Sequence, residues 1–400
     1  MHAKLMITRV LGPCLEGLHR KRFEALMRVA TGLLWGGVCS LSGIALRLGG
    51  PIRYKHRLKC VDRLLGCTGL HRWRDALYQQ VASVWLKDLA QFLVVVDWTD
   101  LSENQRWQCL RASVVVEGRS VTLYEQVHAQ KKLGNPVVHR EFLGRLATIL
   151  PAGSRPIVMT DAGFHSPWFQ AVTKRGWEFI GRVRGCNRLS LGETQDWIAV
   201  RDLYAYASTR ARDLGLGAYA RSNPTSVRVV LAARQNKGRH CLNLYGKKRV
   251  GRASAKAARS AREPWVLVCS PSLVHLQPEA IVSLYAQRMG IEQSFRDTKN
   301  LRWGLGLEVS RSRSRARLEM LLLIAHLVSL AQRLIGECAK RHQQELQFMA
   351  TRRTDRAEIS VLTLARRMLN QGVCNFDSLL PWQAIPPLRA QAAAACARAG

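Results

Sequence analysis

The chain has 400 residues, and its 61 Lys and Arg against 28 Asp and Glu give a formal net charge of +33. This balance excludes most ordinary metabolic enzymes. It favours a polyanionic partner, with nucleic acid ahead of an anionic membrane, which usually also needs an amphipathic or lipid anchor. With 47% hydrophobic and only 22% charged residues, the chain can bury its own cores and is not a disordered basic tail. Its length favours two or three domains.

The cysteines and the apolar runs predict a cytoplasmic protein. The 11 cysteines form no CxxC pair and show no Cys/His spacing typical of zinc sites, so we expect reduced thiols. The first residues lack the apolar stretch of a secretory signal. The longest apolar run, 320–331, is interrupted by His326 and Ser329 and is shorter than the roughly 20 residues that cross a bilayer. We therefore expect no membrane association.

Residues 1–88 show helical periodicity and predict an all-helical N-terminal domain. Around 53–65, apolar residues are spaced for one buried helix face, which leaves a row of cations outward. A short helix, a Gly-Gly-Pro turn and then this basic helix is the order of a helix-turn-helix DNA reader. We expect the outward cations to contact DNA, namely Arg57, Lys59 and Arg63. A solvated basic face on a helical bundle is the alternative.

From about residue 89 the pattern changes to α/β. A β-branched run ends at Asp97, and a strand pair at 109–118 and 119–127 reads as a hairpin turning at Glu117-Gly118. A helix at 138–150, a strand at 156–164, a helix near 167–175 and a strand at 177–185 follow. Strands that arrive first and then alternate with helices are typical of a mixed α/β sheet. We assign a catalytic core to 89–315.

The core is interrupted at about 185–262 by irregular sequence with some strand-like stretches. The stretch 234–262 contains 10 Lys and Arg and no acid, which predicts a flexible cationic loop. Order returns with a strand at 263–270 and a helix at 277–300. An apolar helical region at about 316–346 opens a helical C-terminal part, 316–400, that we expect to serve dimerisation and synapsis.

Two acids stand directly after apolar strand segments. Asp97 follows FLVVV and Asp161 follows IVMT, the place where open α/β sheets usually form a binding crevice. Either acid alone is most often a turn residue or a helix cap. If their strands are neighbours, the two form a carboxylate pair that can hold a divalent metal. Asp100 is a local rival of Asp97, but its position past the strand favours a cap or a turn.

A third acid comes from the helix at 277–300. Four residues of this helix fall within an arc of about 60° on one face, namely Tyr285, Arg288, Glu292 and Lys299. An apolar stripe beside them, at Leu284, Ile291 and Phe295, would pack the helix on the sheet. Gly290 costs about 1 kcal/mol relative to Ala within a helix and could kink it. A surface glutamate among cations is the alternative reading of Glu292.

Together Asp97, Asp161 and Glu292 form a hard oxygen site suited to two Mg²⁺ ions, with Mn²⁺ expected to substitute. Two such ions can activate a water or a 3′-hydroxyl and stabilise the leaving oxygen of a phosphoryl displacement. The cations at 285–299 would supply phosphate contacts. The sequence therefore predicts chemistry on the DNA backbone.

The same motifs resemble a known family. Asp97-Trp98-Thr99, the run 160–164 (TDAGF) and the spaced Tyr285, Arg288, Glu292 and Lys299 look like the three signature regions of bacterial DDE transposases of the insertion-sequence-four family. GRSVTLYE (118–125), RVRG (182–185) and EPWVL (263–267) are also similar to that family. The resemblance covers nearly the whole length of the chain.

The resemblance implies a ribonuclease H-like core with a β-rich insertion before the glutamate, and Asp97, Asp161 and Glu292 as Mg²⁺ ligands. It implies a homodimer that binds terminal inverted repeats, nicks the transposon end, forms and opens a DNA hairpin, and transfers the 3′-hydroxyl to target DNA. Tyr285, Arg288 and Lys299 match phosphate-binding residues. A bacterial cytoplasmic enzyme, associated with the nucleoid when bound to DNA, is expected.

Trp265 matches the family's tryptophan that stacks on a flipped base, although its own surroundings, Val266 to Val268, equally favour a buried core position. Met289 stands where some relatives have a second aromatic, and the last ten residues do not resemble the family's usual ending. Two other functions stay open at this stage. One is a Mg²⁺-dependent structure-specific nuclease on the same core, and the other is a catalytically inactive DNA-binding repressor.

Overall fold

The chain folds into two compact units, which are described separately. The computed structural model describes residues 17–102, 105–192, 196–233, 251, 262–349, 359–373 and 381–397. Unit one comprises Met1–Ser154 and Met289–Ala394, and unit two comprises Arg155–Arg288 and Ala395–Gly400. Nearly all of the predicted cationic loop at 234–262 lies outside the described residues.

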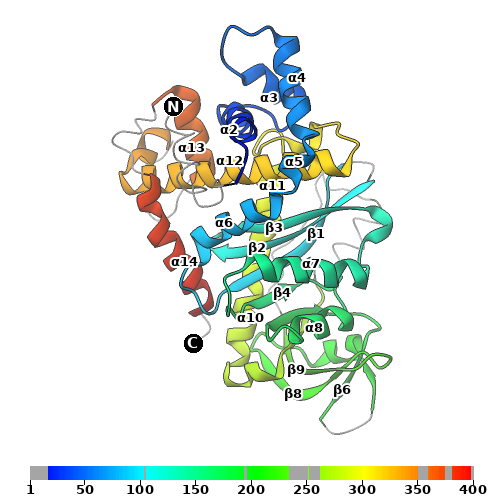
Figure 1. Ribbon diagram of the computed structural model, residues 1–400. Helices are drawn as coiled ribbons and strands as arrows, with labels where there is room; N and C mark the ends of the chain where they lie inside the picture. The colour runs from blue at the N-terminus through cyan, green and yellow to red at the C-terminus, as the bar shows by residue number, and fades with distance from the viewer. Residues whose placement is uncertain are drawn as a thin grey trace. The chain divides into compact units, whose positions relative to one another are not determined.

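Helices make up the described N-terminal part of unit one (Figure 1). They are α2 (Arg20–Leu34), α3 (Leu41–Arg47), α4 (Tyr54–Leu65), α5 (Thr68–His71) and α6 (Arg74–Leu86). Ser40 caps α3, because its Oγ accepts a hydrogen bond of 3.0 Å from the backbone N–H of Gly43. In α4 the residues Val61, Leu64 and Leu65 are buried, which confirms the predicted apolar face of that helix.

Three antiparallel strands follow in unit one: β1 (Leu93–Asp100), β2 (Trp107–Val116) and β3 (Arg119–Ala129). The hairpin between β2 and β3 turns at Glu117-Gly118 as predicted, and Gly118 has φ +65°, a conformation that favours glycine. The short helix η2 (Gln130–Lys132) and then α7 (Pro136–Ile149) come next. Asn135 caps α7 by accepting from the N–H groups of Val137 and Val138.

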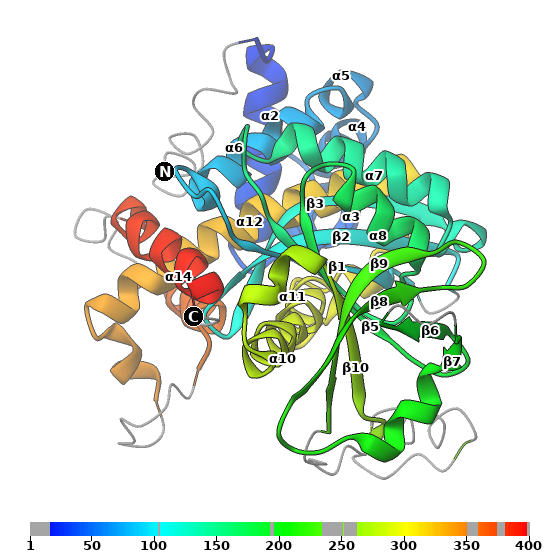
Figure 2. The same ribbon diagram turned by 90° about the horizontal axis from the view of Figure 1, so that it is seen from below.

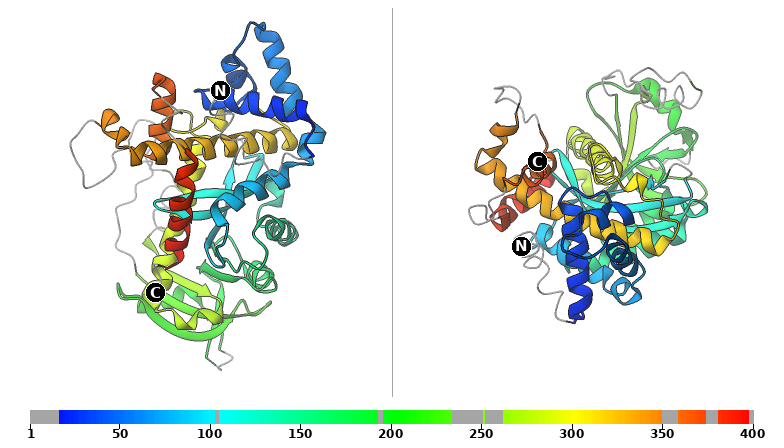
Figure 3. Two further views of the ribbon diagram at one scale, coloured as in Figure 1. Left: turned by 60° about the vertical axis from the view of Figure 1, so that its left-hand side comes forward. Right: turned by 90° about the horizontal axis from the view of Figure 1, so that it is seen from above.

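The long helix α12 (Arg315–Arg341) is the centre of unit one (Figure 3). It packs against α2, β3 and α13 (Val361–Gln371), and Gly336 allows the backbone at Val361 to approach where any Cβ would collide. By length and composition α12 could cross a membrane, but 94% of its most apolar window is buried inside the protein. These residues therefore form the core of unit one, and a role of the C-terminal region in dimerisation and synapsis stays a prediction.

Smaller elements complete the described part of unit one. They are η6 (Leu307–Val309), η7 (Gln344–Phe348), η8 (Pro381–Ala384) and most of α14 (Ile385–Ala397). The guanidinium of Arg389 on α14 donates to the carbonyl of Val84 on α6 over 2.8 Å. The described C-terminal part of the chain is thus helical.

Unit two contains a mixed sheet (Figure 2). Its strands are β4 (Ile157–Thr160), β5 (Glu178–Val183), β6 (Arg188–Leu191), β7 (Ile198–Ala199), β8 (Arg212–Tyr219), β9 (Thr225–Ala232) and β10 (Trp265–Cys269). They lie in the order β4-β5-β10-β9-β8-β6-β7, with β4 and β5 parallel and every later pair antiparallel. The described residues of the predicted irregular region thus form four strands, since β-branched runs such as 225–230 pair with their neighbours.

Helices and short helical turns cover this sheet. They are α8 (Ser166–Thr173), η3 (Val200–Tyr206), η4 (Pro271–His275) and α10 (Pro278–Ala286). Helix α8 packs on β5 and β9, and α10 packs on β5, β8 and β9. Unit two therefore joins a parallel strand pair to an antiparallel extension, and together with the antiparallel strands of unit one this confirms the predicted mixed α/β class.

The prediction of a single helix at 277–300 is wrong in one respect. It divides into α10, the 3₁₀ turn η5 (Gln287–Met289) and α11 (Gly290–Lys299), and the boundary between the units also passes between Arg288 and Met289. Glycine suits position 290, the first residue of α11, because a Cβ there would lie 3.0 Å from the backbone of Arg119 on β3. The expected 60° arc of four residues is therefore not one continuous helix face.

Candidate active site

Asp97 lies where β1 leaves the core of unit one. Leu93–Val96 are buried, whereas Asp97–Asp100 are half-buried. The Oδ1 atom of Asp97 accepts a hydrogen bond of 2.8 Å from the N–H of Trp98. The strand does not end at Asp97 as predicted, because its pairing with β2 continues to Asp100 opposite Gln108. Asp100 is engaged by the Gln108 amide, which supports a local structural role for it.

Helix α11 is attached to β1 through Lys299. Its ammonium donates to Thr99 Oγ1 over 2.7 Å and to the carbonyl of Asp100 over 3.1 Å. Asp97 and Thr99 project from the same face of β1 because side chains alternate along a strand, and Glu292 and Lys299, two helical turns apart, share a side of α11. Unit one thus carries the predicted acids Asp97 and Glu292 on a strand and a helix that Lys299 joins.

Arg111 is a positioning residue that sequence reasoning missed. Asp97, Arg111 and Glu125 stand directly opposite one another on β1, β2 and β3. The Arg111 side chain is 2% exposed and forms an ion pair of 2.8 Å with Glu125. It also donates to Ser294 Oγ over 3.2 Å and to Thr298 Oγ1 over 3.1 Å, both on α11. The sequence does contain a sign of this role, because Arg111 stands within an otherwise largely apolar strand, CLRASVVV.

Further buried polar contacts connect this row to the helices. Tyr78 donates its hydroxyl to Glu125 over 3.2 Å, and burial raises the pKa of Tyr78 well above its usual value. On α12, Glu319 forms an ion pair of 3.0 Å with Arg74 and accepts from the N–H of Val127 over 3.2 Å. Charged groups removed from water require such partners, so this network fixes β3 between α6 and α12.

In unit two, Asp161 follows β4 directly, as predicted. Its Oδ1 accepts a hydrogen bond of 2.8 Å from the N–H of Gly163, which closes a tight turn after the strand. Asp161 is half-buried at this turn. Asp161 is thus a turn residue, the alternative that its sequence position also allowed, and its carboxylate lies at the carboxyl end of β4.

An aromatic and cationic cluster surrounds the end of α10. Tyr285 is 2% exposed, and its ring meets Trp265 edge-on with centroids 4.8 Å apart. The Arg288 guanidinium lies 5.9 Å from the Tyr285 ring centroid. Burial raises the pKa of Tyr285 to about 12, while the charges of Arg288 and Arg182 act to lower it and that of Asp161 to raise it. Trp265 is 9% exposed and belongs to the core as well as to this cluster.

The donor chemistry of the three predicted ligands suits a hard metal ion. Asp97 and Glu292 lie in unit one and Asp161 in unit two. Among the described residues of each unit, no group of three or more His, Cys, Asp or Glu is close enough to hold a metal ion. All three predicted ligands are carboxylates, the oxygen donors that Mg²⁺ and Mn²⁺ prefer.

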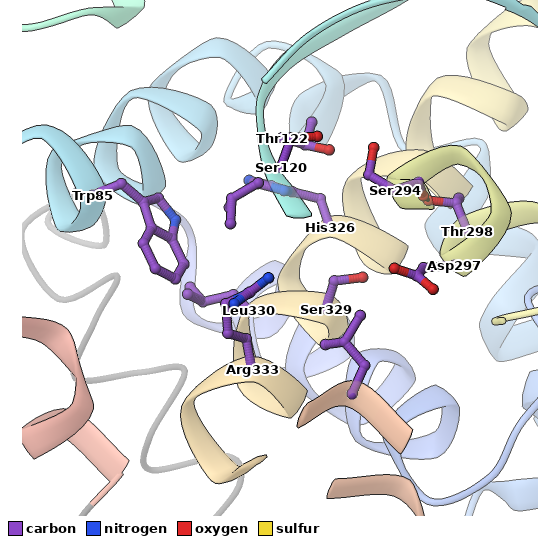
Figure 4. A pocket seen from close by; sticks show the side chains of 12 residues that line it. Trp85, Ser120, Thr122, Ser294, Asp297, Thr298, His326, Ser329, Leu330 and Arg333 are labelled. Atoms are coloured by element: carbon purple, nitrogen blue, oxygen red, sulfur yellow. The ribbon is translucent and has the colours of Figure 1, made fainter. Parts of the chain in front are cut away.

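A small cavity of about 40 Å³ is lined by residues of β3, α11 and α12 (Figure 4). Its lining includes Trp85, Ser120, Asp297, His326 and Arg333. Trp85 Nε1, Ser120 Oγ and His326 Nε2 have no hydrogen-bond partner among the described residues. A cavity of this size with unpaired polar atoms fits a few water molecules and is too small for a nucleotide.

The predicted N-terminal cations have different surroundings. Arg57 donates to the carbonyls of Gly50 and Ile52, each over 2.8 Å, and so holds the turn before α4. Its guanidinium therefore has a structural role, whereas Lys59 and Arg63 are exposed on α4. The short helix α3, the Gly-Gly-Pro turn and the basic helix α4 follow one another in the predicted order. Contact of α4 with DNA stays a prediction.

The comparisons with known proteins identify the family. Residues 92–329, more than half of the chain, match the family model described as "Transposase DDE domain", and this range includes Asp97, Asp161 and Glu292. A cryo-EM structure of the piggyBac transposase synaptic complex with hairpin DNA is similar over 95% of this chain and 80% of that chain, with 10% identity and a TM-score of 0.40. No curated protein matches. The chain belongs to the transposase DDE domain family and is a DNA transposase, an enzyme of DNA phosphoryl transfer.

Proposed function

We propose that this transposase moves a bacterial insertion sequence by a cut-and-paste route, and that Asp97, Asp161 and Glu292 hold its divalent metal ions. Transposase DDE domains generally use such ions. The observation that supports the proposal is the attachment of α11, the helix of Glu292, to β1, the strand of Asp97, by Lys299. Asp161 supplies the third carboxylate from the end of β4.

The protein's own groups would bind and orient the DNA. When bound, Mg²⁺ ions supply the polarisation of the phosphate and the activation of the attacking hydroxyl. Arg288, which lies beside Tyr285, would contact a phosphate, because its guanidinium can give two parallel hydrogen bonds to phosphate oxygens. Lys299 orients α11 and contributes a positive charge next to the acids.

The proposed reaction begins with terminal inverted repeats bound by two protomers, with α4 as the reading helix. The enzyme nicks the transposon end, forms and opens a hairpin, and joins the freed 3′-hydroxyl to target DNA. Each step is a phosphoryl transfer that one pocket can perform in turn. The excess of basic residues suits a nucleoid-associated enzyme of the bacterial cytoplasm.

The test is strand transfer of a precleaved transposon end, taken from the DNA that flanks the gene, into a plasmid. The wild-type chain should join the end in Mg²⁺ or Mn²⁺ and should not do so in EDTA. Asp97→Asn, Asp161→Asn and Glu292→Gln should each lower joining by at least about 1,000-fold while the affinity for the end stays within about threefold. Hydrolysis without a joined product would indicate a structure-specific nuclease, and variants equal to wild type in every assay would indicate a repressor.

A further inference from the structure

The segment after α11 exposes an aromatic ring among arginines. Trp303 is 53% exposed, and its neighbours Leu301 and Val309 are 51% and 42% exposed. The guanidinium carbon of Arg302 lies 4.7 Å from the centroid of the Trp303 ring. A tryptophan is usually buried for the most part, so an exposed one on a polar surface indicates a binding surface.

The backbone around Trp303 is held firmly. Its N–H donates to Asn300 Oδ1 over 2.7 Å, and Arg366 on α13 donates to the carbonyls of Trp303 and, over 2.9 Å, of Gly304. Residue 304 must be glycine, because a Cβ there would collide with the carbonyl oxygen of Asp297 at the end of α11. The backbone that carries the exposed ring is therefore held in one position in unit one, directly after the helix that carries Glu292.

The chain around the ring is strongly basic. The arginine segment, residues 311–317, carries Arg311, Arg313, Arg315 and Arg317, of which the first three are exposed. Arg317 forms an ion pair of 2.7 Å with Asp62, the only acid in α4. This pair neutralises that acid and joins the arginine segment to α4, whose Lys59 and Arg63 are exposed. Two segments far apart in the sequence thus form one basic surface.

DNA fits this surface better than another protein does. A second copy of the chain would bring its own net charge of +33 and the same arginines, which repel one another. DNA offers phosphates to the arginines, and aromatic side chains beside cations are the usual components of sites for unpaired strands. Within an intact duplex the base faces are covered by their neighbours, so a ring of this kind requires an unpaired, flipped or terminal nucleotide.

We propose that Trp303 stacks on an exposed nucleobase of the DNA strand being processed, while the arginine segment binds the phosphates of the flanking backbone. The proposal rests on the function proposed above and adds to it a second DNA contact on unit one, separate from the Trp265 cluster of unit two. Arg302 covers the ring in the absence of DNA and can contribute a cation–π contact to the stacked base.

The test compares two DNAs that differ only in an unpaired nucleotide. One is a blunt duplex, and the other is the same duplex with a four-nucleotide single-stranded extension that contains 2-aminopurine. Full-length Trp303→Ala should bind the extended DNA about 10-fold more weakly than wild type and the blunt DNA within about twofold, and it should lose the quenching of 2-aminopurine. Trp303→Phe should restore most of the affinity for the extended DNA and most of the quenching. Trp35→Ala, at another exposed tryptophan of unit one, is the matched control and should change neither.

Other results would overturn the stacking site. Unchanged affinity and quenching for Trp303→Ala would do so, as would an equal loss on both DNAs. If Trp303→Ala has a lower melting temperature than wild type, the comparison of Trp303→Phe with Trp303→Leu replaces it, since both keep an apolar side chain and only one keeps a ring. Arg313→Gln should weaken both DNAs alike and reduce the salt slope by about one. Failure of the proposed function appears separately, as absent strand transfer by the wild-type chain.

Discussion

Arg111 and Glu125 stand opposite each other on β2 and β3 and form an ion pair of 2.8 Å with each side chain 2% exposed. Asp97 on β1 stands opposite Arg111, so the three residues form one row across the three strands. Because Arg111 also bonds two hydroxyls of α11, it links β2, the strand paired with that of Asp97, to the helix of Glu292. Its charge is satisfied within the core and does not serve DNA directly.

Removing one member of this pair should be costly. Arg111→Met leaves the Glu125 carboxylate buried and unpaired, and we expect a loss of about 3–5 kcal/mol in the free energy of unfolding. Denaturant titration of the pure protein measures it. Arg145→Met, which breaks an exposed ion pair with Asp75, is the control and should cost about 1 kcal/mol or less.

The double variant Arg111→Met/Glu125→Leu separates stability from positioning. Two apolar side chains replace the buried charges, so most of the lost stability should return. Strand transfer should stay at least about 10-fold below wild type, because the hydrogen bonds to Ser294 and Thr298 are still missing. Full recovery of strand transfer would show that Arg111 is needed only for folding.

Lys299→Met should reduce strand transfer by at least about 10-fold with a small change in melting temperature. The substitution removes the hydrogen bonds from α11 to Thr99 and Asp100, and with them the attachment of the helix near Asp97. Arg296→Met, an exposed cation on the same helix, serves as the control and should stay within about twofold of wild type. An equal decrease in both variants would mean that only the charge of the helix matters.

Trp265→Ala distinguishes packing from base stacking. The ring is 9% exposed against Tyr285, so its removal should cost about 3–5 kcal/mol of stability, and Trp265→Phe should recover much of this. If Trp265 also receives a flipped base, Trp265→Ala should block hairpin formation at a temperature where it is folded, while first-strand nicking survives. Gel assays of the two products on one labelled end report both steps.

His326 should make the stability depend on pH. Burial lowers its pKa to about 4 in the folded protein, below the ordinary value of 6.5. The unfolded chain therefore takes up a proton that the folded chain does not between these values. The stabilisation is complete above pH 6.5 and is lost as the pH falls from 6.5 to 4, by about 3 kcal/mol.

Unfolding titrations of wild type and His326→Leu between pH 4 and 8 check this dependence. The difference between the two should shrink as the pH falls below 6.5. His342→Gln, at an exposed histidine of unit one, is the control and should leave the profile unchanged. Parallel profiles for wild type and His326→Leu would show that His326 does not titrate in this range.

Local patterns predicted much of the fold. The β-branched run before Asp97, the Glu117-Gly118 turn and the apolar spacing in α4 depend on neighbouring residues, and the structure has each of them. The end of β1 was wrong because pairing with β2, a contact distant in the sequence, extends the strand to Asp100. Strand ends are thus set by partners that periodicity does not reveal.

The candidate site shows the same limit. Asp97 and Asp161 were predicted because acids are rare in this basic chain and these two follow apolar runs, and Glu292 because of its place on a helix beside Tyr285 and Arg288. Arg111 was missed because its partners, Glu125, Ser294 and Thr298, come together only in the folded chain. For Arg57, composition predicts a DNA contact and does not reveal that two carbonyls of its own turn hold the guanidinium.

The 3₁₀ turn at Gln287–Met289 changes what the motif spacing means. If Tyr285, Arg288, Glu292 and Lys299 shared one helix, a one-residue deletion would rotate the second pair by about 100° about a common axis. With the turn between them, α11 is already fixed by Gly290 against β3 and by Lys299 on β1. A change of length at the turn would therefore strain the connection and leave α11 in place, so the spacing between Arg288 and Glu292 reflects the length of a junction.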